Sequence, residues 1–266
     1  MTTPKISIII PAYNEAHRIG KTLGEYLKYY SSVYPDNFEI IVVLNGCKDN
    51  TEEIVKEFSN SHQCVKYLVF HEAIGKGGAI TKGLEAAKGE LVGYTDADNS
   101  TRPEVLHRLI AALDLTPEID CVVGSRWLSD SKVERQPFVR RVMSRVFNLI
   151  VNMYFGLGLK DTQCGAKFIR REMIPKILPN LMISDMAFDV NFLVDVKKAG
   201  GSILEMPIEW EDDPNSTVNK FQTSVFMFMS VTRLKILYSR FKFIYPILHP
   251  LGLFIRNKVF RAKKVK

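Results

Sequence analysis

No part of this 266-residue sequence is apolar over a length that would cross a bilayer. Its longest uncharged stretches cover residues 146–159, 221–232 and 243–255, and each is shorter than the roughly 18–20 residues of a membrane-spanning helix. The first residues lead directly into an apolar segment, without the basic region and cleavage site of a secretory leader. We therefore expect a peripheral protein on the cytoplasmic face of a membrane.

Cysteine is also scarce. The chain has four cysteines, at positions 47, 64, 121 and 164, with no Cys-x-x-Cys spacing and no pairing with histidine. This spacing argues against a metal site built from thiolates. Reduced thiols in a reducing compartment are the simplest interpretation.

Acidic residues are missing from the C-terminal end. Residues 221–266 contain ten Lys or Arg and no Asp or Glu, so the net charge of +7 leaves 7 − 10 = −3 for residues 1–220. A basic segment favours nucleic acid or an anionic membrane surface. Because this one is rich in Phe, Met and Leu, we predict a lipid surface as the partner and no nucleic acid.

We accordingly predict a catalytic domain over residues 1–220 and a basic, amphipathic, membrane-associating helical tail over residues 221–266. Within the tail, one helical stripe would consist of Met227, Val231, Leu234, Tyr238 and Phe241. The alternative is that residues 221–241 form an ordinary helix whose stripe packs on the core.

Strand and helix patterns alternate through the first half of the chain. Segments typical of strands cover residues 5–10, 39–44, 66–70, 91–95, 120–124 and, later, 203–210. Helical spacing covers residues 15–30, 50–58, 77–88, 103–114, 137–158 and 186–199. This alternation predicts an α/β fold, an open and mostly parallel sheet with helices on both faces. Ligands of such sheets bind beyond the carboxyl ends of the strands.

The segment 91–95 ends in an acidic pair, Asp96 and Asp98, separated by Ala97. Residues i and i+2 of an extended chain point the same way, so both carboxylates can face one divalent cation. Mg²⁺ or Mn²⁺ is usually held by one or two carboxylates together with phosphate oxygens. The alternative is a solvated turn or helix cap, since Asn99, Ser100 and Thr101 precede Pro103.

The strand ends and the segment after residue 160 carry motifs in a defined order. They are Ile8-Ile9-Ile10-Pro11-Ala12-Tyr13-Asn14-Glu15, Gly75-Lys76-Gly77-Gly78-Ala79, Asp96-Ala97-Asp98, Gly124-Ser125-Arg126 and Asp161-Thr162-Gln163-Cys164-Gly165. Over about residues 5–220 the series resembles the inverting family 2 glycosyltransferases of the GT-A fold, in particular the polyprenyl-phosphate glucose and mannose synthases. The segment 161–165 is similar to the glucose-transferring branch.

The resemblance implies a nucleotide-sugar site for UDP-glucose or GDP-mannose. Tyr13 would stack beside the base, and Lys76 and Arg126 would neutralise the diphosphate, helped by a helix N-terminus behind Lys76. Asp96 and Asp98 would hold the metal. The implied donor-binding residues are Pro11, Ala12, Tyr13, Asn14, Glu15, Asn45, Lys76, Asp96, Ala97, Asp98 and Arg126. The family's base-reading acid pair is replaced by Leu44 and Asn45, which leaves uracil and guanine as alternatives.

The implied acceptor is a polyprenyl (dolichyl) phosphate, whose phosphate Arg140 and Lys220 would bind. Such an acceptor is already ionised near neutral pH, because its second pKa is about 6, so it needs no strong general base. Asp98 and Arg126 would stabilise the leaving group. Asp189 would be the base in a relative that acts on a sugar hydroxyl, or else would cap or orient a neighbouring arginine. Two further classes stay open, a nucleotidyltransferase and a non-catalytic membrane-bound module.

Overall fold

The computed structural model describes residues 3–134, 138–211, 220–240 and 242–244. The strands of its main sheet are β1 (Ile6–Ala12), β2 (Phe38–Asn45), β3 (Val65–Phe70), β4 (Leu91–Tyr94), β5 (Cys121–Ser125), β7 (Lys167–Arg170) and β8 (Ile203–Pro207). They are ordered β3-β2-β1-β4-β7-β5-β8. Among the strands that the structure describes in this sheet, only β7 runs antiparallel to its neighbours. The expected, mostly parallel α/β sheet is confirmed.

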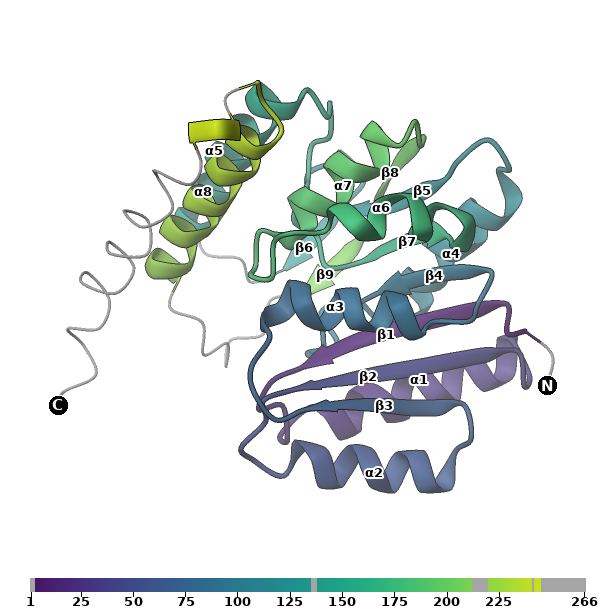
Figure 1. Cartoon of the computed structure of the whole chain (residues 1–266). Coiled ribbons are helices and arrows are strands. Elements are labelled where there is room, and N and C mark those ends of the chain that lie inside the picture. Colours follow the sequence, from purple (N-terminus) through teal and green to yellow (C-terminus); the bar gives the residue numbers. More distant parts are fainter. Residues whose placement is uncertain (1–2, 135–137, 212–219, 241, 245–266) are drawn as a thin grey trace, which may run out of the picture.

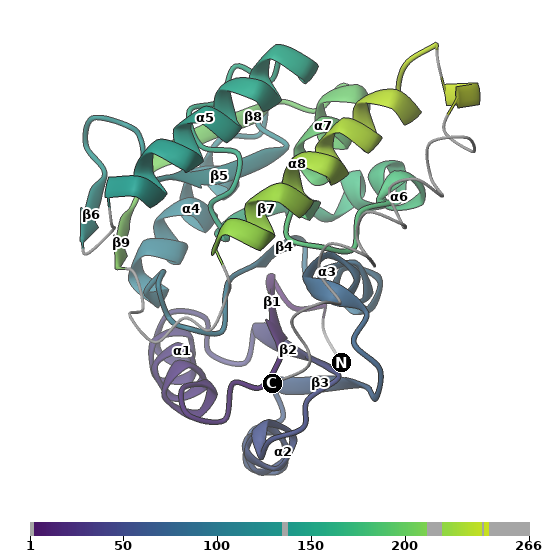
Figure 2. The same cartoon turned by 90° about the vertical axis from the view of Figure 1, so that its left-hand side faces the viewer.

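Helices cover both faces of this sheet (Figure 1). One face carries α1 (Ile19–Val33), α2 (Thr51–Ser61) and α4 (Pro103–Leu115), and the other carries α3 (Gly75–Ala86), α6 (Ile174–Ile177) and α7 (Phe188–Lys198). Two longer helices, α5 (Phe138–Phe155) and α8 (Lys220–Leu237), lie side by side in both views (Figures 1 and 2). Short 3-10 turns cover Arg171–Met173, Leu178–Asn180 and Lys242–Ile244.

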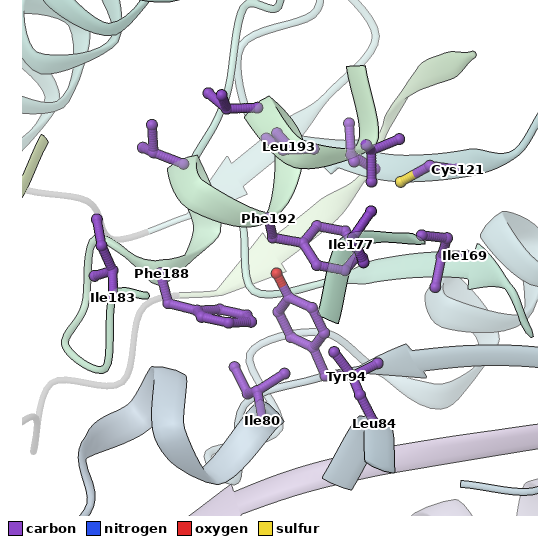
Figure 3. Packing of buried hydrophobic residues seen from close by; sticks show 14 of the residues in the cluster. Ile80, Leu84, Tyr94, Cys121, Ile169, Ile177, Ile183, Phe188, Phe192 and Leu193 are labelled. Atoms are coloured by element: carbon purple, nitrogen blue, oxygen red, sulfur yellow. The ribbon is translucent and has the colours of Figure 1, made fainter. Parts of the chain in front are cut away.

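The inner strands β1, β2, β4 and β5 are buried on both sides, which explains their largely apolar runs. In β1, Ile8 and Ile10 pack with α1 and α4, whereas Ile9 packs on the opposite side with α3. Figure 3 shows the second of these clusters, where Tyr94 of β4 stands among aromatic residues of α7. Packing on both faces therefore fixes the central strands, and with them the edge of the sheet at their carboxyl ends.

Two prolines alter the expected strand boundaries. We expected the first strand to end at Pro11, but β1 continues to Ala12. The missing N–H is tolerated because β4 pairs with β1 only as far as Ile9. The predicted strand 203–210 is instead two strands, since Pro207 ends β8, and β9 (Glu209–Glu211) pairs with β6 (Lys132–Glu134) in a separate small sheet.

The described part of the predicted tail packs on the protein. Val231 and Leu234 of α8 are fully buried, and Met227 and Tyr238 pack partly buried against the same cluster. Four members of the predicted stripe therefore face the core, while Phe241 lies outside the described residues. No helix in the described part of the chain is both long and apolar enough to span a bilayer. The domain boundary at residue 220 stays a prediction.

Candidate active site

The loop after β1 is held by the loop after β2. The backbone of Asn14 is left-handed (φ 55°), and its side-chain oxygen accepts a hydrogen bond from the Lys48 N–H at 2.7 Å. The Glu15 N–H donates to the Thr51 hydroxyl at 2.8 Å, and the Glu15 carboxylate accepts from Arg18 at 2.8 Å. Tyr13, next to this braced turn, is 52% exposed. Its ring is therefore presented to solvent at the sheet edge, as a base-stacking residue requires.

Other predicted donor-binding residues are occupied by structural contacts. Asn45 is buried, and its side-chain oxygen accepts from the Ile74 N–H at 2.7 Å, just before α3. The buried residues Ala12 and Ala97 use their carbonyls to accept from Cys47 Sγ and the Thr22 hydroxyl. Pro11 lies within β1. These residues fix the backbone around the site, and their predicted contacts with the donor remain predictions.

The carboxylates of Asp96 and Asp98 differ in their surroundings. Asp96 Oδ1 lies 2.6 Å from Lys76 Nζ. Burial alone would raise the pKa of Asp96, but the Lys76 ammonium outweighs burial and holds this pKa below its usual value. Asp98 accepts hydrogen bonds from the Ser100 N–H, at 3.0 Å, and from the Ser100 hydroxyl. Burial, followed by the charge of Asp96, nevertheless raises the pKa of Asp98.

This pair suits a hard divalent cation. Its donors are carboxylate oxygens, and burial, followed by the charge of Asp96, raises the pKa of Asp98, so a bound cation would favour the charged form of both groups. No cluster of three or more His, Cys, Asp or Glu side chains that could hold a metal occurs among the described residues. Asp96 and Asp98 therefore fit Mg²⁺ or Mn²⁺ as a pair of carboxylates whose cation would also be bound by phosphate oxygens of the substrate.

The N-terminus of α3 is already capped. The N–H groups of Gly77 and Gly78 donate to the Ser184 carbonyl, at 2.8 Å and 3.4 Å. Gly75, with φ +80°, allows this approach, since a Cβ there would lie 2.1 Å from the same carbonyl oxygen. Two N–H groups of this helix end are therefore occupied by Ser184, and the expected help of the helix N-terminus to Lys76 stays a prediction. Lys76 is the group of this turn that faces the carboxylate pair.

Arg126 is not an isolated phosphate-binding cation. Its Nε and Nη2 atoms donate to the two Asp161 carboxylate oxygens at 2.7 Å and 3.0 Å, and the side chains are 8% and 1% exposed. The Trp210 ring lies 5.3 Å from the Arg126 guanidinium carbon. Burial raises the pKa of Asp161, but Arg126 outweighs it and keeps this pKa below its ordinary value. Arg126 and Asp161 therefore form a buried ion pair and not a surface salt bridge.

Gly165 forms a wall behind Asp96. A Cβ on Gly165 would lie 2.1 Å from Asp96 Oδ2, closer than any non-bonded contact. The Asp161–Gly165 motif therefore contributes to the candidate site in two places, because Gly165 lies against Asp96 and Asp161 fixes Arg126. Sequence reasoning identified this motif only as a family marker, without a role.

Gly165→Ala is expected to turn the Asp96 carboxylate away and to lower kcat/KM by about a hundredfold, the typical effect of a 1 Å misplacement. Steady-state kinetics with the expected nucleotide-sugar donor, and the affinity for its nucleotide with Mn²⁺, would measure the change. Gly24→Ala in α1 is the matched control, because a Cβ there would meet no atom within 4 Å outside its own stretch of helix. A Gly165→Ala protein with unchanged nucleotide affinity and kinetics would contradict the assigned contact between Gly165 and Asp96.

The remaining predicted residues divide into two groups. Asp189, in the first turn of α7, is 2% exposed and binds Lys167 and Tyr94. It orients a lysine, not the arginine that we considered. Arg140 lies in the first turn of α5, and Lys220 is the first residue of α8. The side chains of both are outside the described part of the structure.

Comparison with known proteins gives a consistent match. Residues 7–178 match the model of glycosyl transferase family 2. The chain is 32% identical over 216 residues to glycosyltransferase AglD of Haloferax volcanii, covering 81% of this chain and 34% of that protein. It is 34% identical over 215 residues to dolichyl-phosphate beta-glucosyltransferase ALG5C of Trichomonas vaginalis, covering 77% and 64%. The chain thus spans about a third and just under two thirds of these relatives' lengths.

The fold is also similar to solved structures. Glucosyl-3-phosphoglycerate synthase from Mycobacterium tuberculosis, in complex with Mn²⁺, UDP and glucosyl-3-phosphoglycerate, superimposes with a TM-score of 0.63 at 19% identity, covering 86% of this chain and 80% of that one. At this identity the likeness concerns the fold, and it confirms the expected GT-A-like architecture.

Proposed function

Because the chain belongs to glycosyl transferase family 2, we propose that it is a hexosyltransferase that moves glucose from UDP-glucose to a polyprenyl (dolichyl) phosphate, with inversion at the anomeric carbon. The 34% sequence identity to a protein named dolichyl-phosphate beta-glucosyltransferase supports glucose as the sugar and dolichyl phosphate as the acceptor. The observation that carries the proposal is the group of charges at the sheet edge: Asp96 and Asp98 beside Lys76, with Arg126 fixed nearby by Asp161.

This group of charges suits a departing nucleoside diphosphate. A divalent cation held by Asp98, with Asp96 alongside, would supply positive charge to the diphosphate oxygens. Lys76 reaches the same place from α3, and preorganised charge of this kind stabilises a transition state without reorganisation. The acceptor phosphate arrives ionised, so the chain needs to position it rather than to remove a proton.

A lipid acceptor requires contact with a membrane, and α5 offers a surface for it. Its exposed apolar side chains fall on one helical stripe, at Val142 (44% exposed), Val146 (51%), Leu149 (61%) and Met153 (73%). Arg141 and Arg145 are exposed on the same helix. An apolar stripe flanked by basic residues favours the interface of an anionic bilayer. We propose this peripheral attachment at the cytoplasmic face, with Arg140 and Lys220 binding the acceptor phosphate.

Replacing Leu149 and Met153 together with glutamine is expected to weaken binding to vesicles containing anionic lipid by about tenfold, which corresponds to partial loss of two buried apolar side chains. Vesicle co-sedimentation would measure this. The matched control is Leu115→Gln, which removes an 81% exposed leucine from α4. Equal binding by the two variants would contradict a role for the α5 stripe.

The reaction is tested by incubating the protein with a short polyprenyl phosphate, Mg²⁺ or Mn²⁺, and radiolabelled UDP-glucose or GDP-mannose in parallel. We expect label that is extractable into chloroform and released by mild acid, with UDP-glucose as the donor. The same product from GDP-mannose would make the protein a mannosyltransferase. Label confined to water-soluble products would reject the lipid acceptor and favour transfer to a sugar hydroxyl.

A further inference from the structure

A buried ion pair lies directly behind the candidate active site. Lys167, the first residue of β7, is fully buried, and its ammonium donates to Asp189 Oδ1 at 2.6 Å and to the Cys164 carbonyl. The two side chains are 0% and 3% exposed. Desolvating two charges is so unfavourable that an apolar pair of similar volume is often at least as stable. Packing alone therefore does not account for this pair.

Asp189 is enclosed by donors and aromatic rings. The Tyr94 hydroxyl donates to the same Oδ1 atom at 2.7 Å, and the Tyr94 ring centre is 5.6 Å from Lys167 Nζ. Burial, followed by the charge of Asp189, raises the pKa of Tyr94 well above its ordinary value, so this hydroxyl stays a donor. Figure 3 shows the Tyr94 ring among Phe188, Phe192 and Ile80, with its oxygen directed toward α7.

The pair reaches the metal-binding carboxylates through the chain that it holds. Lys167 binds the carbonyl of Cys164, and the next residue, Gly165, abuts Asp96 so closely that a Cβ would lie 2.1 Å from Oδ2. Four residues earlier, Asp161 of the same loop fixes Arg126. A shift of Lys167 would thus move the wall behind Asp96 and the partner of Arg126 together.

We propose that Asp189 and Lys167 are a positioning pair that locks loop 161–165 against Asp96, and that Asp189 is not a general base. This inference deepens the proposed function and rests on it, because a phosphate acceptor brings its own negative charge. A sugar-hydroxyl acceptor would instead need a base that can reach it within hydrogen-bond distance. Asp189 is bound on the inner side of the site by Lys167 and Tyr94.

The test compares Asp189→Asn, Lys167→Gln and the double variant. Asp189→Asn leaves the Lys167 charge unpaired, so we expect kcat/KM to fall about a hundredfold through misplacement of the loop. Calorimetry should show weaker binding of UDP with Mn²⁺ by about tenfold or more. In the double variant, the introduced glutamine amide would donate to the Cys164 carbonyl and to the introduced asparagine without any buried charge. Activity and UDP affinity should then recover at least about tenfold relative to Asp189→Asn.

A general base predicts the opposite pattern. Asp189→Asn would abolish turnover with UDP affinity unchanged, and the double variant would be equally inactive; either result, in protein shown to be folded by circular dichroism, overturns the proposal. If Asp189→Asn does not fold, Tyr94→Phe replaces it, since both charges stay in place. If Tyr94→Phe lowers the UDP affinity and leaves the pH profile of kcat unchanged, the positioning role is supported. If the variant shifts the acidic limb of the pH profile of kcat, the positioning role is rejected.

Failure of the proposed function gives a different result. If the wild-type protein transfers no sugar to a polyprenyl phosphate, the proposed reaction is wrong. The binding series with UDP, or with GDP if that is the nucleotide bound, still shows whether Lys167 and Asp189 position the loop.

Discussion

Asp98→Asn is expected to lower kcat by about two to three orders of magnitude, the range found when one preorganised charge-stabilising group is removed. Asparagine keeps the shape of the side chain and can still accept a hydrogen bond from Ser100. The substitution removes one of the two negative charges that would hold the cation, at the carboxyl group whose pKa is raised by burial and by Asp96. The loss should therefore concern cation binding, measured as weaker Mn²⁺ affinity by calorimetry, with an unchanged thermal unfolding temperature.

Asp114→Asn is the matched control for this change. Asp114 is an exposed carboxylate that pairs with Lys5 Nζ at 2.7 Å. Lys5 comes just before β1, so this pair lies at the edge of the sheet opposite the candidate site. Exposed pairs contribute about 0–1 kcal/mol, so both activity and stability should stay near wild type. If Asp98→Asn retained most of the wild-type turnover, or if turnover persisted under chelation, the assigned cation site would be wrong. A non-catalytic binding module would show no loss in either variant.

The second large effect is expected on stability. Asp161→Asn leaves the Arg126 charge buried without its partner, which typically lowers the free energy of unfolding by about 3–5 kcal/mol. For a chain of this size the unfolding temperature should fall by roughly ten degrees. Differential scanning calorimetry at pH 7 would measure this. Glu52→Gln, which breaks the exposed Glu52–Lys56 pair of 2.7 Å, is the control and should change stability by less than about 0.5 kcal/mol.

The same pair predicts a pH dependence. The pKa of Asp161 is lowered in the folded protein, so its stabilisation is complete above the ordinary carboxyl pKa of about 4. The stabilisation is lost as the pH falls through the lower, folded-state value. The difference in stability between wild type and Asp161→Asn should therefore be large at pH 7 and shrink below about pH 4. A constant difference across this range would contradict the charge assignment.

Much of the fold could be predicted because buried parallel strands are apolar throughout. The strands from β1 to β5 lie within a few residues of their expected positions, and the acidic pair lies directly after β4, at the edge where we place the candidate site. The strand β7 escaped detection because Lys167 and Arg170 flank only two apolar residues, Phe168 and Ile169. The charge of Lys167 is tolerated there by Asp189, a partner that no local pattern indicates.

The parts of the site that were missed share one cause. The missed residues lie on the segment from the end of α5 to the start of β7, which follows the alternating strands and helices in the sequence; they are Asp161, Gly165 and Lys167. Periodicity likewise identified the stripe of α8 but could not tell whether lipid or protein covers it. Val231 and Leu234 show that protein does. A glycine whose only purpose is to leave room for a distant carboxylate has no sequence signal beyond its motif.

The antiparallel strand β7 has a consequence for how the chain is made. It separates β4 from β5 and bonds to both, so the residues up to 125, when they leave the ribosome, lack the strand that joins β5 to their sheet. Until residue 170 emerges, the nascent polypeptide exposes a bare edge of β4, which is the kind of surface that chaperones shield and that promotes aggregation. Truncated products ending before that point would contain the acidic pair yet be unable to complete the structure around it.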